Sequence, residues 1–357
     1  GYNGNTVATL HFDFGMTGRI PYYTSTGVAV NGGLPQLMNM STHLAQWRRD
    51  IERQIPDPAS SAVISLDWEA WWPLEELNLA EPRLMIYVNM SRALVRLRQP
   101  SLPPAQVVAV AKTEWESATK ELFVQTLRVA KAMRPYASWG WYDYPACSWG
   151  RGPDMCKGAG TTLNTQLDWL WQEIDHFAPS VYLCSQATCS LHTSAENAAI
   201  VNDSMRGMAN LSERLFGSSS KDKRPPALYP YVWYEYYDTE PAGSTGRPVA
   251  FLSKADIENS FRIPALWGAS GVIIWGANSD GRTPALCHAL ETYVRGTFGP
   301  VVLEVVESRQ KCSQLHCSDH GRCSELAKNS GCQCFAGFSG KACESTLDGM
   351  QREREGE

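Results

Sequence analysis

The sequence predicts an α/β protein in which a β/α barrel is followed by a small disulfide-rich module. Short apolar runs alternate with segments of helical periodicity between residues 60 and 300, as expected for repeated strand–helix units. Six of the 11 cysteines lie close together from Cys312 to Cys343, which marks a change of character near the C-terminus. The 357 residues suffice for one large core with a small appendage.

The strand–helix alternation can be followed along the chain by its apolar pattern. Strands are expected at residues 62–66, 138–141, 180–183, 227–233 and 271–275. Helices are expected at residues 103–133, 163–177, 195–216, 284–295 and after Ser253, which is placed to cap one. Strands this apolar indicate a parallel sheet covered on both faces.

A doubly wound sheet and a barrel both fit this alternation. No Gly-x-Gly-x-x-Gly turn follows any expected strand, so a dinucleotide site is unsupported. Polar and aromatic residues recur where the expected strands end, and barrel enzymes gather their chemistry at that face. The barrel is therefore the favoured architecture.

Charge and composition narrow the possible partners. The formal net charge of −5 argues against a nucleic-acid-binding protein. No apolar run is long enough to span a membrane, no signal peptide is visible, and the chain does not begin with Met, as expected of a processed or excised chain. The 13 Trp and 14 Tyr suit a carbohydrate-binding cleft and an ordinary core equally well.

The other cysteines and the glycosylation sequons indicate an oxidising compartment. Cys147 and Cys156 form one close pair, Cys184 and Cys189 form another, and Cys287 stands alone. Four Asn-x-Ser sequons are present, and they begin at Asn39, Asn89, Asn202 and Asn210. We therefore expect a disulfide within each close pair, in a secreted or lysosomal glycoprotein.

The C-terminal cysteines have a regular spacing. It reads Cys312-x4-Cys317-x5-Cys323-x8-Cys332-x-Cys334-x8-Cys343. Six cysteines permit fifteen pairings, but this spacing resembles an EGF-like module, whose pattern joins first to third, second to fourth and fifth to sixth. We expect a barrel domain at residues 1–306, the EGF-like module at 307–345 and a charged, disordered tail at 346–357.

The sharpest chemical motif is a pair of acids that follows the first apolar strand. Asp67 and Glu69 are separated by Trp68, and in an extended backbone residues i and i+2 point the same way. Two carboxylates that close repel, so one of them is expected to hold its proton near neutral pH and to serve as a general acid. An alternative is a helix N-terminus, where the dipole favours acids. The position after a buried strand, among three indoles, favours the catalytic interpretation.

The segment Asp67-Trp68-Glu69-Ala70-Trp71-Trp72-Pro73 resembles the catalytic segment of animal hyaluronidases. Further segments match in the family's order, and the resemblance covers nearly the whole chain. They are Ile20–Tyr23, Gly32–Gln36, Trp139–Cys147, Pro179–Tyr182, Pro230–Val232, Gly271–Gly276 and the cysteine-rich module.

The resemblance implies an endo-β-N-acetylhexosaminidase that hydrolyses glycosaminoglycans, hyaluronan or chondroitin, with retention. Glu69 would be the general acid/base, and Asp67 would orient the substrate's acetamido group, whose carbonyl oxygen is the internal nucleophile. Tyr182 would hydrogen-bond the acetamido group, while Tyr142, Tyr231 and Trp275 would line the pocket. The same aromatic residues could instead be core side chains. The resemblance implies no metal, no cofactor and a monomer.

The chain departs from the family pattern where substrate carboxylates are expected to bind. Trp72 replaces an arginine, a second arginine position falls at Ile200, and Asp13 replaces the tyrosine of an Ile-Phe-Tyr segment that here reads His11-Phe12-Asp13. We keep Trp72 and Asp13 as substrate-binding candidates. The departures leave open a second hypothesis, that of a weakly active or inactive relative that binds glycans or proteins.

The beginning of the sequence is also shorter than the family pattern. The family begins with a further strand whose cysteine bridges to the position of Cys287. We therefore expect a distorted TIM-type barrel without its first strand and a free thiol at Cys287, whether as a fragment, a truncated gene prediction or a natural variant. The sequence leaves open the preferred polysaccharide, the pH optimum, the role of the EGF-like module and the choice between a lysosomal, secreted or membrane-tethered protein.

Overall fold

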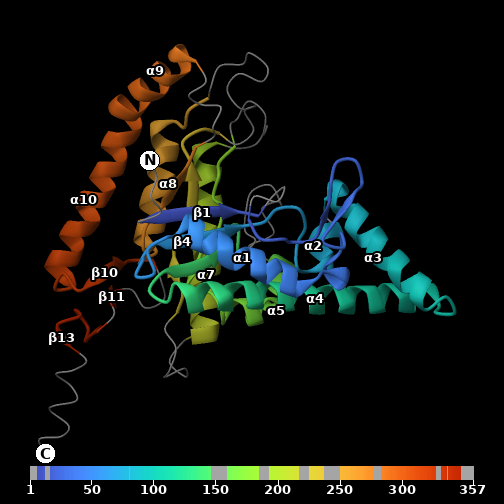
Figure 1. Cartoon of the computed structure of the whole chain (residues 1–357). Coiled ribbons are helices and arrows are strands. Elements are labelled where there is room, and N and C mark those ends of the chain that lie inside the picture. The colour runs from blue at the N-terminus through green and yellow to red at the C-terminus, as the bar shows by residue number, and fades with distance from the viewer. Residues whose placement is uncertain are drawn as a thin grey trace, which may run out of the picture. The chain divides into compact units, whose positions relative to one another are not determined.

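The structure is a computed structural model, and it divides into two compact units (Figure 1). The first comprises residues 1–142 and 162–176, and the second residues 143–161 and 177–357. The residues that the structure describes are 6–12, 17–79, 81–145, 159–184, 193–216, 225–236, 250–276, 283–326, 331–335 and 337–346.

A parallel three-stranded sheet is the centre of the first unit. Its strands β1 (Val7–His11), β4 (Val63–Asp67) and β5 (Ser138–Trp141) lie in the order β1-β4-β5. The register pairs His11 with Asp67 at the carboxyl ends of β1 and β4. The last four residues of β4 are buried, as the apolar run predicted for a strand covered on both faces.

The first unit also contains helices, and part of one of them (residues 159–161) belongs to the second unit. They are α1 (Met40–Gln54), α2 (Glu75–Leu79), α3 (Met85–Arg98), α4 (Pro104–Met133), α5 (Ala159–Gln166) and α6 (Asp168–Trp171). The long α4 packs against both α1 and α3, and it begins with a proline, which suits a first helical turn. Trp47 of α1 stabilises the contact between α1 and α4, because its Nε1 donates to the carbonyl oxygen of Thr126 of α4 at 3.0 Å.

The remaining short elements of the first unit form a hairpin and two 3₁₀ turns. β2 (Tyr22–Tyr23) pairs with β3 (Ala29–Val30) in antiparallel fashion. The 3₁₀ turns span Pro35–Leu37 and Pro82–Leu84.

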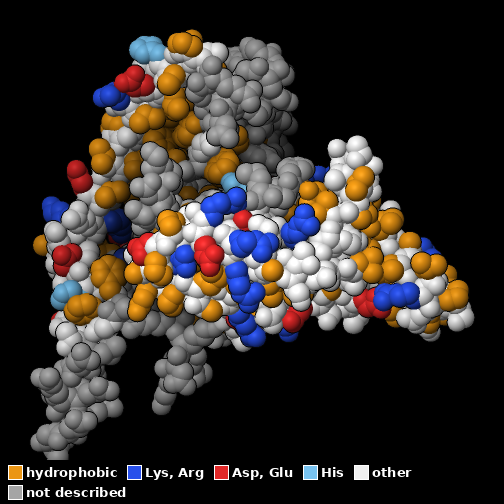
Figure 2. All heavy atoms as spheres, in the orientation of Figure 1, with side chains coloured by type: hydrophobic (Ala, Val, Ile, Leu, Met, Phe, Trp, Pro, Cys, Tyr) orange, Lys and Arg blue, Asp and Glu red, His pale blue; other side chains and the backbone are white. Residues whose placement is uncertain are grey.

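The exposed surface of α1 is basic. Its residues Arg48, Arg49 and Arg53 are exposed, and Figure 2 shows basic side chains gathered over this helix.

Aromatic side chains fill much of the core of the first unit. The rings of Phe123 and Trp141 stack with centroids 4.1 Å apart, and Phe12 packs on Trp47 at 5.1 Å. Trp71 lies edge to face with Trp115 at 5.4 Å. Most of the described indoles are buried, so the wealth of Trp in the composition serves packing more than an open cleft.

The second unit contains a second stretch of parallel strands. β8 (Tyr231–Trp233) pairs with β9 (Ile273–Trp275), and an isolated parallel bridge joins Ser180 to Tyr231. The short strands β6 (His176–Phe177) and β7 (Ala227–Leu228) also pair. The helices are α7 (Ser194–Phe216), α8 (Lys254–Leu266), α9 (Pro284–Tyr293) and α10 (Gly299–His316). Ser253 caps α8 as predicted, accepting from the backbone N–H of Asp256.

Four predicted elements differ from the structure. The helix predicted at 163–177 ends at Trp171, and residues 176–177 form β6 instead. The strand predicted at 227–233 is divided at Tyr229 and Pro230, and the one at 180–183 is reduced to the bridge at Ser180. The final helix continues through a π-helical turn (Val294–Phe298) into α10, so the predicted boundary at residue 306 falls inside a helix.

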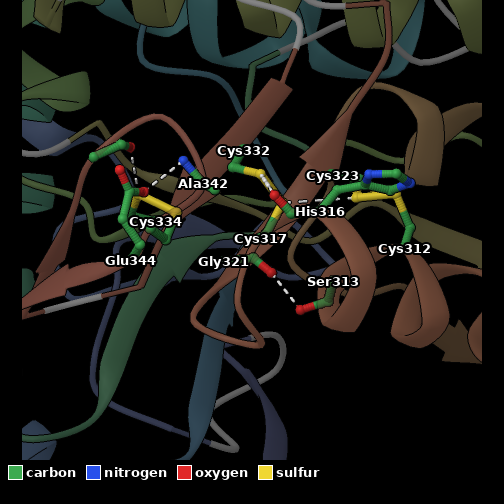
Figure 3. The surroundings of a disulfide bond; sticks show 12 residues. Cys312, Ser313, His316, Cys317, Gly321, Cys323, Cys332, Cys334, Ala342 and Glu344 are labelled. Atoms are coloured by element: carbon green, nitrogen blue, oxygen red, sulfur yellow. Dashed lines mark hydrogen bonds between the residues drawn. A yellow bond between two sulfur atoms is a disulfide. The ribbon is translucent and has the colours of Figure 1, made fainter.

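The C-terminal disulfides have the predicted pairing. Cys312 bonds to Cys323, Cys317 to Cys332 and Cys334 to Cys343 (Figure 3). Two antiparallel ribbons accompany them, β10 (Gly321–Ser324) with β11 (Gly331–Cys334) and β12 (Phe338–Ser339) with β13 (Ser345–Thr346).

The other cysteine predictions are tested in part. Cys184 is disulfide-bonded, but its predicted partner Cys189 lies outside the described residues. The disulfide predicted between Cys147 and Cys156 stays a prediction, because Cys156 lies outside the described residues, and so does Cys147. Cys287 on α9 is a free and exposed thiol, as predicted.

The cysteine-rich region is attached to the helices of the second unit. The backbone N–H groups of Glu325 and Leu326 both donate to the carbonyl oxygen of Leu266 at the end of α8, at 2.7 and 3.1 Å. Glu325 also forms an ion pair with Arg309 of α10 at 2.8 Å.

Helix α10 carries apolar side chains on its surface. Its residues Leu303, Val306 and Leu315 are exposed, and Figure 2 shows hydrophobic side chains along this helix.

Removing one disulfide from this region should destabilise the protein measurably. The double substitution C312S/C323S opens an 11-residue link, and we expect the free energy of unfolding to fall by about 2–3 kcal/mol. Urea denaturation measures the change. C287S is the matched control, because its thiol makes no bond and its removal should leave the denaturation midpoint unchanged. Equal midpoints for the double variant and the wild type would contradict the expectation.

Candidate active site

The acidic pair lies where β4 ends. Asp67 is the last residue of the strand and is 5% exposed, whereas Glu69, two residues further, is exposed. Trp68 between them is buried and meets the rings of Trp71 and Tyr22 edge-on, at 5.4 and 6.1 Å. A large ring anchored between two acids fixes the backbone that carries both, so the pair is held by the core and not by a loose loop.

The two carboxylate oxygens of Asp67 have different surroundings. Oδ2 lies 2.6 Å from Nδ1 of His11, the cross-strand partner on β1. Oδ1 is buried and has no hydrogen-bond partner among the described residues. A buried acceptor without a partner is costly, and such exceptions in folded proteins often have a functional reason. Oδ1 is therefore an acceptor whose hydrogen-bonding capacity is unused in the described part of the chain.

The backbone of residues 72–74, which follow Glu69, is held by hydrogen bonds to the fully buried side-chain amide of Asn78. Its Oδ1 accepts from the backbone N–H of Trp72 at 2.8 Å, and its Nδ2 donates to the carbonyl oxygens of Trp72 and Leu74 at 2.8 and 3.0 Å. Trp115 also donates from Nε1 to the oxygen of Trp72 at 3.0 Å. Sequence reasoning missed Asn78, because nothing in its surroundings resembles a motif.

Trp72 itself is buried and does not line an open surface. Its ring is 1% exposed, and its Nε1 donates to Glu81 at 3.2 Å. In this conformation the side chain packs the loop that follows the acids, where the sequence analysis had placed a substrate contact.

Two buried histidines lie in β6 and in α1. Nε2 of His176 lies 3.2 Å from Oγ of Ser65, and Nδ1 of the same ring lies 2.9 Å from Oγ of Ser138. A side chain at position 140 would collide with His176, so β5 needs a glycine there to lie this close to His176. Burial, helped by Lys131, lowers the pKa of His176 to about 3, and burial lowers the pKa of His43 to about 4. Both are therefore neutral at physiological pH.

The predicted aromatic residues divide between the two units. Tyr142 follows β5 in the first unit, and its N–H donates to the oxygen of Leu66 at 2.9 Å, which places it beside the end of β4. In the second unit, Tyr182 lies edge-on to Trp233 with centroids 5.8 Å apart. Trp275 is in register with Trp233 at the ends of β8 and β9. Asp13 lies outside the described residues.

Tyr231 differs from the other aromatic candidates, because it is fully buried. Its carbonyl oxygen accepts from the N–H of Val181 at 2.9 Å, and its own N–H donates to the oxygen of Pro179 at 2.8 Å. Its described contacts hold the strands together. Trp233 was not predicted as a site residue, although its place at the end of a strand was a usable signal.

Comparison with known proteins decides the family. The family model described as Hyaluronidase matches residues 3–331. The chain belongs to the hyaluronidase family of glycoside hydrolases. It is 33% identical to human hyaluronidase-1 over 316 residues, which are 86% of this chain and 67% of that protein. It is 30% identical to rat hyaluronidase-3 over 351 residues, 91% of this chain and 80% of that one.

A solved structure agrees with this membership. Bee venom hyaluronidase, in complex with a hyaluronic acid tetramer, matches with a TM-score of 0.73 and 30% identity, covering 85% of this chain and 88% of that one. The fold is therefore that of the barrel-type hyaluronidases, in agreement with the β/α architecture predicted from the sequence.

The sequons of this hyaluronidase relative lie in different environments. Asn89 and Asn210 are exposed. Asn39 caps α1, accepting from the N–H of Thr42 at 3.0 Å, and Asn202 accepts from Nε1 of Trp267 at 2.9 Å. Glycans at Asn89 and Asn210 would therefore leave the described hydrogen bonds intact.

Neither a cluster of metal-ligating side chains nor a membrane-spanning helix occurs in the described part of the chain. There, no group of three or more His, Cys, Asp or Glu side chains is arranged to hold a metal ion. Within the same ranges, no helix is both long and apolar enough to cross a membrane.

The buried histidines should make this protein less stable in acid. In the folded chain the pKa of His43 is about 4 and that of His176 is about 3, whereas a histidine in the unfolded chain has a pKa of roughly 6.5. Below pH 6.5 the unfolded chain binds protons that the folded chain does not, so the stability present above pH 6.5 is lost as the pH falls. We expect the free energy of unfolding to drop by up to about 1.4 kcal/mol per pH unit for each histidine. Urea denaturation at pH 7, 6 and 5 measures it, and a constant or rising value would contradict the expectation.

Proposed function

We propose that this protein is an endo-β-N-acetylhexosaminidase that cleaves hyaluronan or chondroitin, with Glu69 as general acid/base. The observation that carries the proposal is the acidic pair at the end of β4, in which Asp67 keeps one buried oxygen without a described partner. The names of the relatives support the substrate class, since they are hyaluronidases and one was solved with a hyaluronic acid tetramer.

The unpartnered oxygen of Asp67 suits the acetamido group of an N-acetylhexosamine. Its Oδ1 would accept the N–H of that group, which turns the group's carbonyl oxygen toward the anomeric carbon and increases its negative character. The carbonyl oxygen is then the nucleophile, as in the substrate-assisted glycosidases. An oxygen without a protein donor keeps all of its acceptor capacity for this N–H.

Glu69 would transfer the proton in both steps. In the first, its carboxyl gives a proton to the glycosidic oxygen while the acetamido oxygen bonds to the anomeric carbon and the glycosidic bond breaks. In the second, the carboxylate removes a proton from a water molecule, which attacks the anomeric carbon from the other face and opens the cyclic intermediate. Two inversions leave the configuration retained, and the acid is regenerated.

The aromatic residues take their proposed roles from the family resemblance. Tyr182 would hydrogen-bond the acetamido group, and its ring contact with Trp233 limits its freedom to move. Tyr142 and Trp275, both half-buried, would contact sugar rings. Tyr231 would support Tyr182 through the strand beside it. Asp13 and Trp72 remain proposals for substrate contact, the latter requiring the loop to move.

The finer architecture is proposed along the same lines. We propose a distorted barrel at residues 1–306 and an EGF-like module at 307–345, for which the three disulfides and two ribbons are the support. The described disulfides also support an extracytoplasmic location, secreted or lysosomal, since such bonds persist in oxidising compartments. We propose that the protein acts as a monomer.

Replacing Glu69 tests the proposed function. E69Q retains the size of the side chain and removes the transferable proton, so kcat on hyaluronan or chondroitin should fall about 10²–10⁴-fold with KM nearly unchanged. Product sizing with a reducing-end assay measures it. E307Q, on the exposed surface of α10, is the matched control and should retain wild-type rates. Wild-type turnover in E69Q would overturn the assignment, and a wild type without activity on either polymer would overturn the proposed function.

A further inference from the structure

The end of β1 faces the end of β4 in a fixed register. Val7 to His11 pair with Val63 to Asp67 without a bulge, so His11 and Asp67 lie directly beside each other. The next residue continues the ladder, because the N–H of Phe12 donates to the carbonyl oxygen of Asp67 at 2.9 Å. Phe12 is itself buried among aromatic rings, which leaves little freedom for β1 to slide.

The side-chain contact between the two residues is short and largely shielded from solvent. Nδ1 of His11 is 2.6 Å from Oδ2 of Asp67, with the two side chains 29% and 7% exposed. An imidazole that donates from Nδ1 can do so as the neutral tautomer or as the cation, so the contact does not require one protonation state. A charged or charge-assisted hydrogen bond in such surroundings is strong enough to select one rotamer of the carboxylate.

Selection of one rotamer matters because the two oxygens of a carboxylate are chemically equivalent until a partner distinguishes them. With Oδ2 bonded to His11, Oδ1 is the oxygen left without a described partner. We propose that His11 is a positioning residue, which holds Asp67 so that Oδ1 alone is presented to the acetamido N–H of the substrate. The inference rests on the proposed function and deepens it.

Position 11 is one of the places where this chain departs from the family pattern. In the family resemblance the corresponding segment reads Ile-Phe-Tyr, which places isoleucine at position 11, and an isoleucine has no donor. In this chain an imidazole therefore stands where the family pattern has an apolar side chain, and it lies against the acid. Sites whose reacting groups are oriented by a hydrogen-bonded neighbour lose rate when that neighbour is removed, even though it does not touch the substrate.

Three substitutions at position 11 test the inference on the full chain. H11I suits a strand and removes the donor. H11N places an amide N–H about where Nδ1 lies, while H11Q places its amide one bond further from the backbone. We expect kcat on hyaluronan or chondroitin to fall on the order of 10–100-fold in H11I and H11Q, with KM changed much less, and H11N to retain most of the wild-type kcat.

Controls separate positioning from folding. H288N and H288I, at an exposed histidine of α9, should leave kcat and the unfolding temperature unchanged. If H11I does not fold, the comparison of H11N with H11Q decides. Wild-type kcat in H11I, or equal kcat in folded H11N and H11Q, would overturn the inference and leave the proposed function standing. A wild type inactive on both polymers would overturn both.

Discussion

The pairing of β1 with β4 is the constraint on which the described site depends. It places His11 beside Asp67, and without that partner a carboxylate that is 5% exposed would have no printed hydrogen bond to either oxygen from the described residues. An unpaired buried charge is among the costlier features of a folded protein, so the register and the acid stabilise each other. The indole of Trp68 and the amide of Asn78 then fix the backbone that carries Glu69 and the residues after it.

Long elements with a clear apolar period were predicted well from the sequence. The strand predicted at 62–66 and the helices α4 and α7 lie within two residues of their predicted bounds. These elements are predictable because the spacing of apolar residues along the chain follows from which face of the element is buried. Helix α10 was missed for a physical reason. Gly299 and Pro300 look like a helix end, yet a proline is also tolerated in a first helical turn, and here a π-helical turn leads straight into it.

The two acids of the candidate site can be proposed from the sequence, whereas some of the residues around them cannot. Asp67 and Glu69 follow from local pattern, since both lie on one short segment. His11 does not, because its contact with Asp67 arises from a parallel register between segments more than fifty residues apart, which no local pattern encodes. The burial of Trp72 and Tyr231 could not be read from their types either, since an aromatic ring at a strand end suits a cleft and a core equally.

The central claim is that Oδ1 of Asp67 is the acceptor for the substrate's acetamido group. A crystal structure of the E69Q variant with a hyaluronan tetrasaccharide tests it most directly, because the inactive variant would hold the substrate uncleaved. The account predicts an acetamido nitrogen within about 3 Å of Oδ1, with Oδ2 still bonded to Nδ1 of His11. A bound sugar whose acetamido group points away from Asp67, or an Asp67 released from His11 to meet it, would contradict the account.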